Sequence, residues 1–206
     1  IELLADMLRN SRLDEGDIKK EQGVVCEEIS MVEDTPDDLV HELVASGFYG
    51  SNPLGQTILG TKERVNSFTA EDLRKYMRKR YTTGNIVLSI AGNVDEQVTL
   101  EMLRECFSEG IEQAPGSNDA LETRPRGSQS TVFAVKDNEQ MNMCMTFDGA
   151  GSRDEDFYPL TVFNGAFGGS MSSMLFQTMR EQNGLIYSIY SYASSYNDCG
   201  VYSIYA

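Results

Sequence analysis

The chain has 206 residues and a formal net charge of −15, with 17 basic against 32 acidic side chains. This acidic balance argues against nucleic acid and anionic membranes as partners, since both attract basic surfaces, although it would suit a basic partner. No apolar run approaches the ~20 residues needed to cross a bilayer, and nothing at the start resembles a signal peptide. The four cysteines form no CxxC pair. This argues against a cysteine-based zinc site and predicts reduced thiols in a reducing, cytoplasmic compartment.

The first part of the sequence predicts helices separated by short breaks. Residues 35–38 (TPDD) indicate a helix start, with a possible cap, a proline suited to the first turn and two acidic residues at the positive end. Residues 69–72 (TAED) form a capping-box pattern with Asp in place of the usual Glu. Residues 47–61 are rich in Gly, Asn and Pro and predict an irregular loop, whereas residues 85–91 (NIVLSIA) predict a strand. The predicted helices span residues 1–9, 14–33, 36–46, 69–81 and 95–107.

The predicted helix over residues 14–33 carries two glutamates within its apolar stripe. If Glu21 is placed at zero on a helical wheel, Glu28 falls at about −20°, Val32 at about 20° and Val25 at about 40°. We therefore expect both carboxylates on the buried side of the helix. A buried carboxylate is costly unless a cation, a metal or several hydrogen bonds receive it. Two readings stay open: an ordinary ion pair with a neighbouring element, or one functional site.

The second part of the sequence follows a change in composition. Residues 109–128 contain two prolines, three glycines and few apolar side chains, which is typical of a linker. Because strands and helices then interleave without a regular βαβ rhythm, the fold class predicted is α+β. The predicted strands here are residues 131–136, 141–148, 185–193 and 199–206, and the predicted helices are residues 156–167 and 172–182.

Several other motifs favour ordinary structural roles. The only histidine, His41, precedes Glu42, but HELVA lacks the second histidine of HExxH, so we interpret His41 as a surface or partly buried helix residue. With one histidine so placed, a Ser–His or Cys–His nucleophile system is not expected. The glycines of FGGSMSS lack the GK[ST] of a phosphate loop, and the basic run RKYMRKRY reads as a solvated helix face.

The segment MREQNGLIYS has more chemical interest. Arg180 lies at the predicted end of a helix and Tyr187 at the start of a strand, with Gly184 making the turn between them. A cation and a phenol brought together at this corner could hold a peptide carbonyl or a carboxylate. The alternative is an arginine in an ion pair and a tyrosine in a sheet.

Taken in order, these motifs resemble the pitrilysin/insulinase family of zinc peptidases, and within it the bacterial and mitochondrial-processing-peptidase-like branch. The matching segments are ExxxxxxE at Glu21–Glu28, NPLGQTILGT, FTAEDL, NIVLSIAGN, GGSMSSMLFQTMRE and GLIYS. They cover nearly the whole chain except the linker. The resemblance implies LuxS/mitochondrial processing peptidase-like metallohydrolase halves, both incomplete: residues 1–110 from the first half, a linker at 111–128, and residues 129–206 from the second.

The resemblance also implies roles for individual residues. Such peptidases hold Zn²⁺ with two histidines of an inverted HxxEH motif, and Glu28 matches the distal glutamate that completes the metal site. Glu21 matches the acidic residue that supports the site from outside. Arg180 and Tyr187 match a pair that binds the substrate backbone and helps stabilise the transition state. Met174 stands where many relatives have Arg, so part of the second-half surface is expected to differ.

HxxEH is absent from the sequence, and the resemblance implies that it lies upstream of Ile1. Both ends of the chain also interrupt apparent elements, so we interpret the chain as an excerpt of a longer protein. The parent is therefore predicted to be a zinc metalloendopeptidase acting on peptides or unfolded proteins enclosed between two halves. The chain itself is expected to be inactive and to bind no zinc tightly. A homodimer or heterodimer is compatible with this reading. The alternatives are a non-catalytic partner or structural subunit of the same family, and an unrelated acidic scaffold.

Overall fold

The computed structural model describes residues 1–108, 111, 114 and 125–206, and it divides into two units. The first unit comprises Ile1–Cys26 and Lys62–Ala120, and the second comprises Glu27–Thr61 and Leu121–Ala206. Helices and a small antiparallel sheet make the chain α+β, as predicted. The predicted linker, residues 111–128, lies largely outside the described residues, so the predicted boundaries of the two halves remain a prediction.

The first unit is built from helices. It contains α1 (Glu2–Arg9), the first part of α2 (Glu15–Asp34), α4 (Lys62–Ser67), α5 (Ala70–Arg80), η2 (Thr83–Asn85) and α6 (Glu96–Phe107). The predicted capping box of α5 is present: the Asp72 backbone N–H donates to the Thr69 hydroxyl, and the Thr69 N–H donates to the Asp72 carboxylate. The short helix α4 was not predicted.

Two predicted strands are wrong. Residues 85–91 are described without strand structure, and Val87 is 91% exposed. Residues 131–136 are also not a strand. At the two ends of this stretch, Ser130 Oγ donates to the carbonyl of Gly47 (2.7 Å) and Lys136 Nζ donates to the carbonyl of Glu33. A β-propensity pattern becomes a strand only when a neighbouring strand completes the hydrogen-bond ladder, and the described residues supply none for these segments.

The second unit contains a three-stranded antiparallel sheet in the order β1-β3-β2. Its strands are β1 (Cys144–Gly149), β2 (Tyr190–Ser195) and β3 (Gly200–Tyr205). Tyr205 of β3 pairs with Cys144 on one side and with Tyr190 on the other. The predicted strand over residues 185–193 begins only at Tyr190, because the residues that follow the turn at Gly184 form no ladder.

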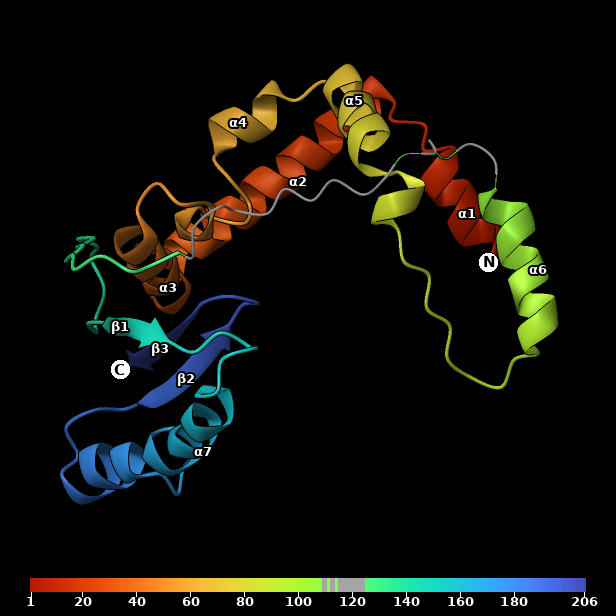
Figure 1. Cartoon of the computed structure of the whole chain (residues 1–206). Helices are drawn as coiled ribbons and strands as arrows, with labels where there is room; N and C mark the ends of the chain where they lie inside the picture. The colour runs from red at the N-terminus through yellow and green to blue at the C-terminus, as the bar shows by residue number, and fades with distance from the viewer. Residues whose placement is uncertain (109–110, 112–113, 115–124) are drawn as a thin grey trace. The chain divides into compact units, whose positions relative to one another are not determined.

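Helices cover both faces of this sheet, so the second unit has three layers, which Figure 1 shows as α3, the strands and α7. Side chains alternate between the two faces of a strand. On β2, the hydroxyl of Tyr192 hydrogen-bonds His41 of α3 (Pro36–Tyr49), whereas the hydroxyl of Ser191 donates to Asn164 of α7 (Phe157–Phe167). Alternate residues of β2 therefore contact different helices.

The remaining segments are short. The loop over residues 47–61 contains the 3₁₀ turn η1 (Pro53–Gly55), so it is irregular as predicted. The predicted helix over residues 172–182 contains a π-helical segment, η3 (Phe176–Gln182), instead of a regular α-helix. Single π-helical turns occur frequently at functional sites, and this one carries Arg180. Among the described residues, no helix is both long and apolar enough to span a bilayer.

Candidate functional site

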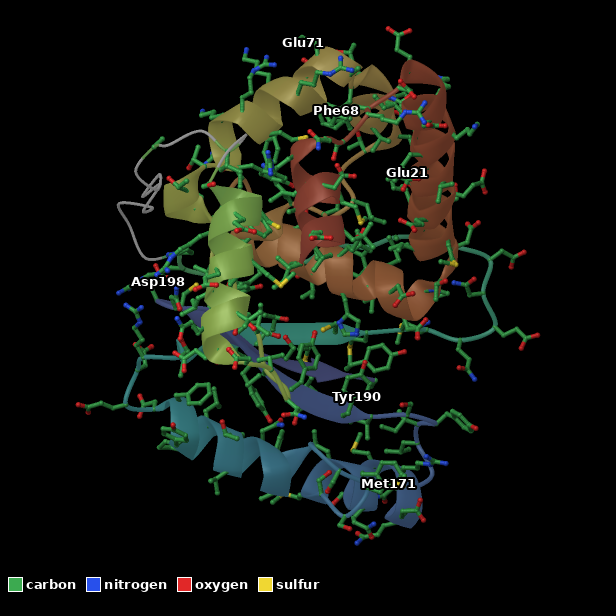
Figure 2. All side chains as sticks on the ribbon, turned by 90° about the vertical axis from the view of Figure 1, so that its right-hand side faces the viewer. Glu21, Phe68, Glu71, Met171, Tyr190 and Asp198 are labelled. Atoms are coloured by element: carbon green, nitrogen blue, oxygen red, sulfur yellow. The ribbon has the colours of Figure 1, made fainter. Side chains whose placement is uncertain are left out.

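Glu21 and Glu28 lie on the same side of α2 but are exposed, so the predicted burial of this side is wrong (Figure 2 labels Glu21). The buried residues of the helix are the next ones along, Gln22 and Ile29. The Gln22 amide donates to the backbone carbonyls of Val65 (3.0 Å) and Phe68 (2.9 Å), between α4 and α5. Two satisfied hydrogen bonds allow a polar side chain to be buried. The buried stripe is therefore rotated by about 100° from the apolar stripe of the wheel.

The apolar side chains near the two glutamates are buried only in part: Val25 and Val32 are half-buried, and two others are exposed. Val24 is 51% exposed and Met31 is 64% exposed. Glu21 and Glu28 are separated by seven residues, which is about 10.5 Å along a helix axis. Since zinc–carboxylate distances are about 2.0–2.2 Å, the two glutamates cannot bind one ion together directly. This spacing allows one of the two glutamates to bind a zinc ion directly, while the other lies outside the shell of ligands.

The described residues do not form a complete metal site. No group of three or more His, Cys, Asp or Glu side chains in this part of the chain could hold a metal ion. A catalytic zinc ion needs three protein ligands and keeps one position for water. Glu28 is exposed and offers one carboxylate, which fits one ligand position of such a site.

Arg180 and Tyr187 are brought together, as the corner motif predicted. The Arg180 guanidinium carbon lies 5.1 Å from the centre of the Tyr187 ring and 4.9 Å from the centre of the Phe176 ring. The backbone N–H of Gly184 donates to the carbonyl of Arg180 (3.0 Å), and Gly184 has φ +58°, a conformation that favours glycine. A cation held against aromatic rings in this way keeps a defined orientation.

The Arg180–Tyr187 pair is open to solvent. Tyr187 is 77% exposed, and the Arg180 side chain is 38% exposed. Arg180 Nε lies 3.9 Å from the Glu181 carboxylate, a long contact near the surface that contributes little. It uses at most one of the five N–H donors of the guanidinium. The pair is therefore able to receive a carbonyl or a carboxylate. Met174, two residues before η3, is exposed on the surface as well.

His41 has a role that the sequence did not reveal. Its Nδ1 lies 2.9 Å from the hydroxyl of Tyr192, and its Nε2 lies 3.2 Å from the hydroxyl of Tyr190. Its ring centre lies 5.3 Å from that of Tyr205, whose hydroxyl donates to the Asn142 side chain (2.7 Å). The only signal in the sequence was the alternation of Tyr190 and Tyr192 in the segment YSYASS. Which helix residue would meet them depends on the packing of α3.

Burial keeps the imidazole of His41 and the phenols and thiol of this cluster in their neutral forms near pH 7. Burial lowers the pKa of His41, and the nearby carboxylates Asp37 and Asp38 offset this only in part. Burial raises the pKa of Tyr192 to about 12 and raises the pKa of the Cys144 thiol. A thiol with a raised pKa is unreactive, because the thiolate is the nucleophile. This cluster is therefore built to bridge two elements and not to attack a substrate.

The first unit has a separate pocket of about 690 Å³. None of the predicted site residues lines it. Its lining is mainly apolar and aromatic, with Arg80 and Asn85 as polar exceptions. Such a lining suits packing against another apolar element more than catalysis. The apolar residues are Leu4, Leu8, Tyr76, Tyr81, Ile86, Leu88 and Phe107.

Two family models match the chain. A model described as the peptidase M16 inactive domain matches residues 67–206, and a model described as insulinase (peptidase family M16) matches residues 1–62. A Bacillus subtilis protein named as an uncharacterized zinc protease is 43% identical over 205 residues, which cover 100% of this chain and 49% of that protein. A Streptomyces coelicolor protein with a similar name is 39% identical over 214 residues, which cover 100% of this chain and 46% of that protein.

Several solved structures have the same fold as this chain. A peptidase M16 inactive domain from Pseudomonas fluorescens superposes with a TM-score of 0.87 at 18% identity, covering 98% of this chain and 49% of that chain. A protease from Helicobacter pylori superposes with a TM-score of 0.88 at 18% identity, covering 100% and 50%. At such low identity these matches show the fold. The chain spans about half the length of the relatives and structures it matches.

Proposed function

Because this chain belongs to the insulinase family of M16 peptidases, we propose that it is an internal part of a zinc metalloendopeptidase. In this proposal the intact protein hydrolyses peptide bonds of peptides enclosed between two homologous halves. The observation that carries the proposal is the contact between Arg180 and Tyr187 at the end of η3. This cation and phenol stand together, exposed, at the positions that match the substrate-binding pair of the family. Relatives named as zinc proteases support the metal.

Glu28 is assigned one ligand position in a zinc site whose other ligands lie outside this chain. Its exposure on α2 leaves the carboxylate accessible to an ion. Glu21, on the same side of the helix and two turns away, acts on the ligands from outside the metal shell. When bound, zinc lowers the pKa of a bound water towards 7 and polarises a carbonyl. Outer residues of this kind typically change metal affinity or activity by about 10- to 100-fold.

Arg180 and Tyr187 hold the substrate in this proposal. The guanidinium can donate two parallel hydrogen bonds to a carboxylate or one to a peptide carbonyl, and the phenol can donate another. Donors placed where negative charge develops stabilise the transition state more than the ground state. The contacts of the guanidinium with the rings of Phe176 and Tyr187 hold these donors in place before substrate arrives.

The test uses the full-length protein with three single variants. We expect Glu28→Gln to lower peptide hydrolysis on the order of 100-fold and to reduce bound zinc, and Glu21→Gln to lower hydrolysis by about 10- to 100-fold. The matched control is Glu27→Gln, which changes an adjacent glutamate of the same helix that is also exposed, and it should leave both quantities unchanged. Zinc is measured by elemental analysis after gel filtration. Equal zinc content in Glu28→Gln and the unmodified protein would remove Glu28 from the metal site.

A non-catalytic subunit is the second candidate, favoured by one observation. The model that matches residues 67–206 describes an inactive domain. In this reading Glu28 is a remnant, and the protein contributes to a heterodimer whose other chain carries the catalysis. Sequencing the coding region upstream of Ile1 separates the two candidates. An intact HxxEH motif supports the peptidase, and a degenerate motif supports the subunit.

A further inference from the structure

His41 joins α3 to β2, the two elements of the second unit that adjoin the segments with Glu28 and with the Arg180–Tyr187 pair. Both of its ring nitrogens hydrogen-bond tyrosine hydroxyls of one strand, β2: Tyr192 at 2.9 Å and Tyr190 at 3.2 Å. A neutral imidazole has one donor and one acceptor, and a phenol can serve as either, so both bonds are satisfied in either tautomer. Figure 2 labels Tyr190, which lies on β2. The bridge therefore fixes both the position and the rotation of α3 on the strand.

On the helix side, this bridge is connected to Glu28 without a flexible loop. Thr35 is the only residue between α2 and α3. Its backbone N–H donates to the carbonyl of Val32 (3.2 Å), its hydroxyl donates to the carbonyl of Met31 (2.7 Å), and its own carbonyl accepts from Leu39 (2.9 Å). Because the junction is bonded on both sides, a tilt of α3 carries the last turns of α2, including Glu28, with it.

On the strand side, the bridge is connected as closely to the Arg180–Tyr187 pair. Tyr187 precedes Tyr190 by three residues, and Ile189 between them is buried. The turn before Tyr187 is closed by the bond from the Leu185 N–H to the carbonyl of Met179 (3.0 Å). A shift at the start of β2 therefore moves Tyr187 and, through its ring contact, Arg180.

We propose that His41, through its hydrogen bonds to Tyr190 and Tyr192, is a positioning residue that sets the Glu28 end of α2 relative to the Arg180–Tyr187 pair. This inference rests on the proposed peptidase function. His41 touches neither metal nor substrate in this role. It acts on catalysis by holding two elements at a fixed separation, and misplacement of a reacting group by about 1 Å costs about 100-fold in rate.

The test compares three variants of the full-length protein on a fluorogenic peptide. His41→Phe keeps an aromatic ring against Tyr205 and removes both hydrogen bonds, and Tyr192→Phe removes one. We expect kcat to fall by about 10- to 100-fold with KM changed less than about twofold, because the groups misplaced act in the transition state. The matched control is Tyr205→Phe, which removes a hydroxyl from the same sheet face that hydrogen-bonds Asn142 and not His41. It should leave kcat unchanged.

Two further readouts separate positioning from simple packing. Bound zinc should be unchanged in all three variants, and the double variant His41→Phe/Tyr192→Phe should lose no more activity than His41→Phe, because both changes remove one shared interaction.

The outcomes distinguish this inference from the proposed function. If Glu28→Gln abolishes hydrolysis but His41→Phe and Tyr192→Phe behave like Tyr205→Phe, the peptidase stands and the positioning role is wrong. Additive losses of activity in the double variant would also overturn it. If the unmodified full-length protein cleaves no peptide, both proposals fail. Should His41→Phe not fold, Tyr190→Phe and Tyr192→Phe decide the question, since each removes only one hydroxyl.

Discussion

At the scale of single residues, the contrast between Glu21 and Gln22 shows how side chains are selected for the inside of α2. Apolar periodicity pointed to Glu21, yet Gln22 is buried because the carbonyls of Val65 and Phe68 receive its amide. Burial of a polar group depends on partners, and these partners are more than forty residues away in sequence. The exposed carboxylates are thereby left free for an ion.

Replacing Gln22 should destabilise the first unit. We expect Gln22→Ala to lower the free energy of unfolding by about 1–3 kcal/mol, because two backbone carbonyls lose their donor inside the protein. The measurement is urea unfolding of this chain followed by circular dichroism. The matched control is Glu21→Gln, an exposed neighbour, which should change stability by less than about 0.5 kcal/mol. A larger effect for Glu21→Gln than for Gln22→Ala would mean that the wheel identified the buried side correctly.

At the scale of elements, the turn at the end of η3 decides where Arg180 and Tyr187 stand. The π-helical segment ends within three residues of Gly184, whose positive φ reverses the chain towards β2. Two backbone hydrogen bonds, to the carbonyls of Arg180 and Met179, close this turn. The pair is thus positioned by backbone geometry and by ring stacking, and not by an ion pair.

Replacing Gly184 by alanine should lower the stability of the chain, whereas the same replacement of Gly165, in the same unit, should not. Gly184→Ala should destabilise the chain by about 1–2 kcal/mol, because a Cβ is unfavourable in the left-handed conformation. Gly165→Ala should instead stabilise it by about 0.5–1 kcal/mol, since Gly165 lies inside α7 and an added Cβ would meet no atom within 4 Å. Both are measured as shifts in the urea midpoint. Equal effects at the two positions would contradict the role given to Gly184.

At the scale of the whole molecule, the described part of the chain does not form a complete metal site. Its described residues offer no group of three metal-binding side chains. The relatives it matches are about twice as long. Catalysis, metal binding and substrate enclosure therefore belong to the full-length protein in our proposal.

Removal of metal should affect the full-length protein and not this chain. We expect a chelator to abolish peptide hydrolysis by the full-length protein and added Zn²⁺ to restore it. The melting temperature of this chain alone should change by less than about 1 °C with zinc or chelator, because an ion that does not bind the native state cannot stabilise it. Differential scanning fluorimetry of the chain, beside a hydrolysis assay of the full-length protein, checks both. Tight zinc binding by the chain would show that its own side chains form a metal site.

The sequence by itself determined the α+β class, most helix positions, the capping box at Thr69 and the family, because these follow from local periodicity, capping chemistry and ordered motifs. It also predicted that a turn at Gly184 would bring Arg180 to Tyr187, which are close in sequence. Tertiary structure alone decided which side of α2 is buried, that residues 85–91 and 131–136 are not strands, and that His41 bridges to β2. Each of these depends on partners distant in sequence, and local pattern carries no information on which partners a segment will meet.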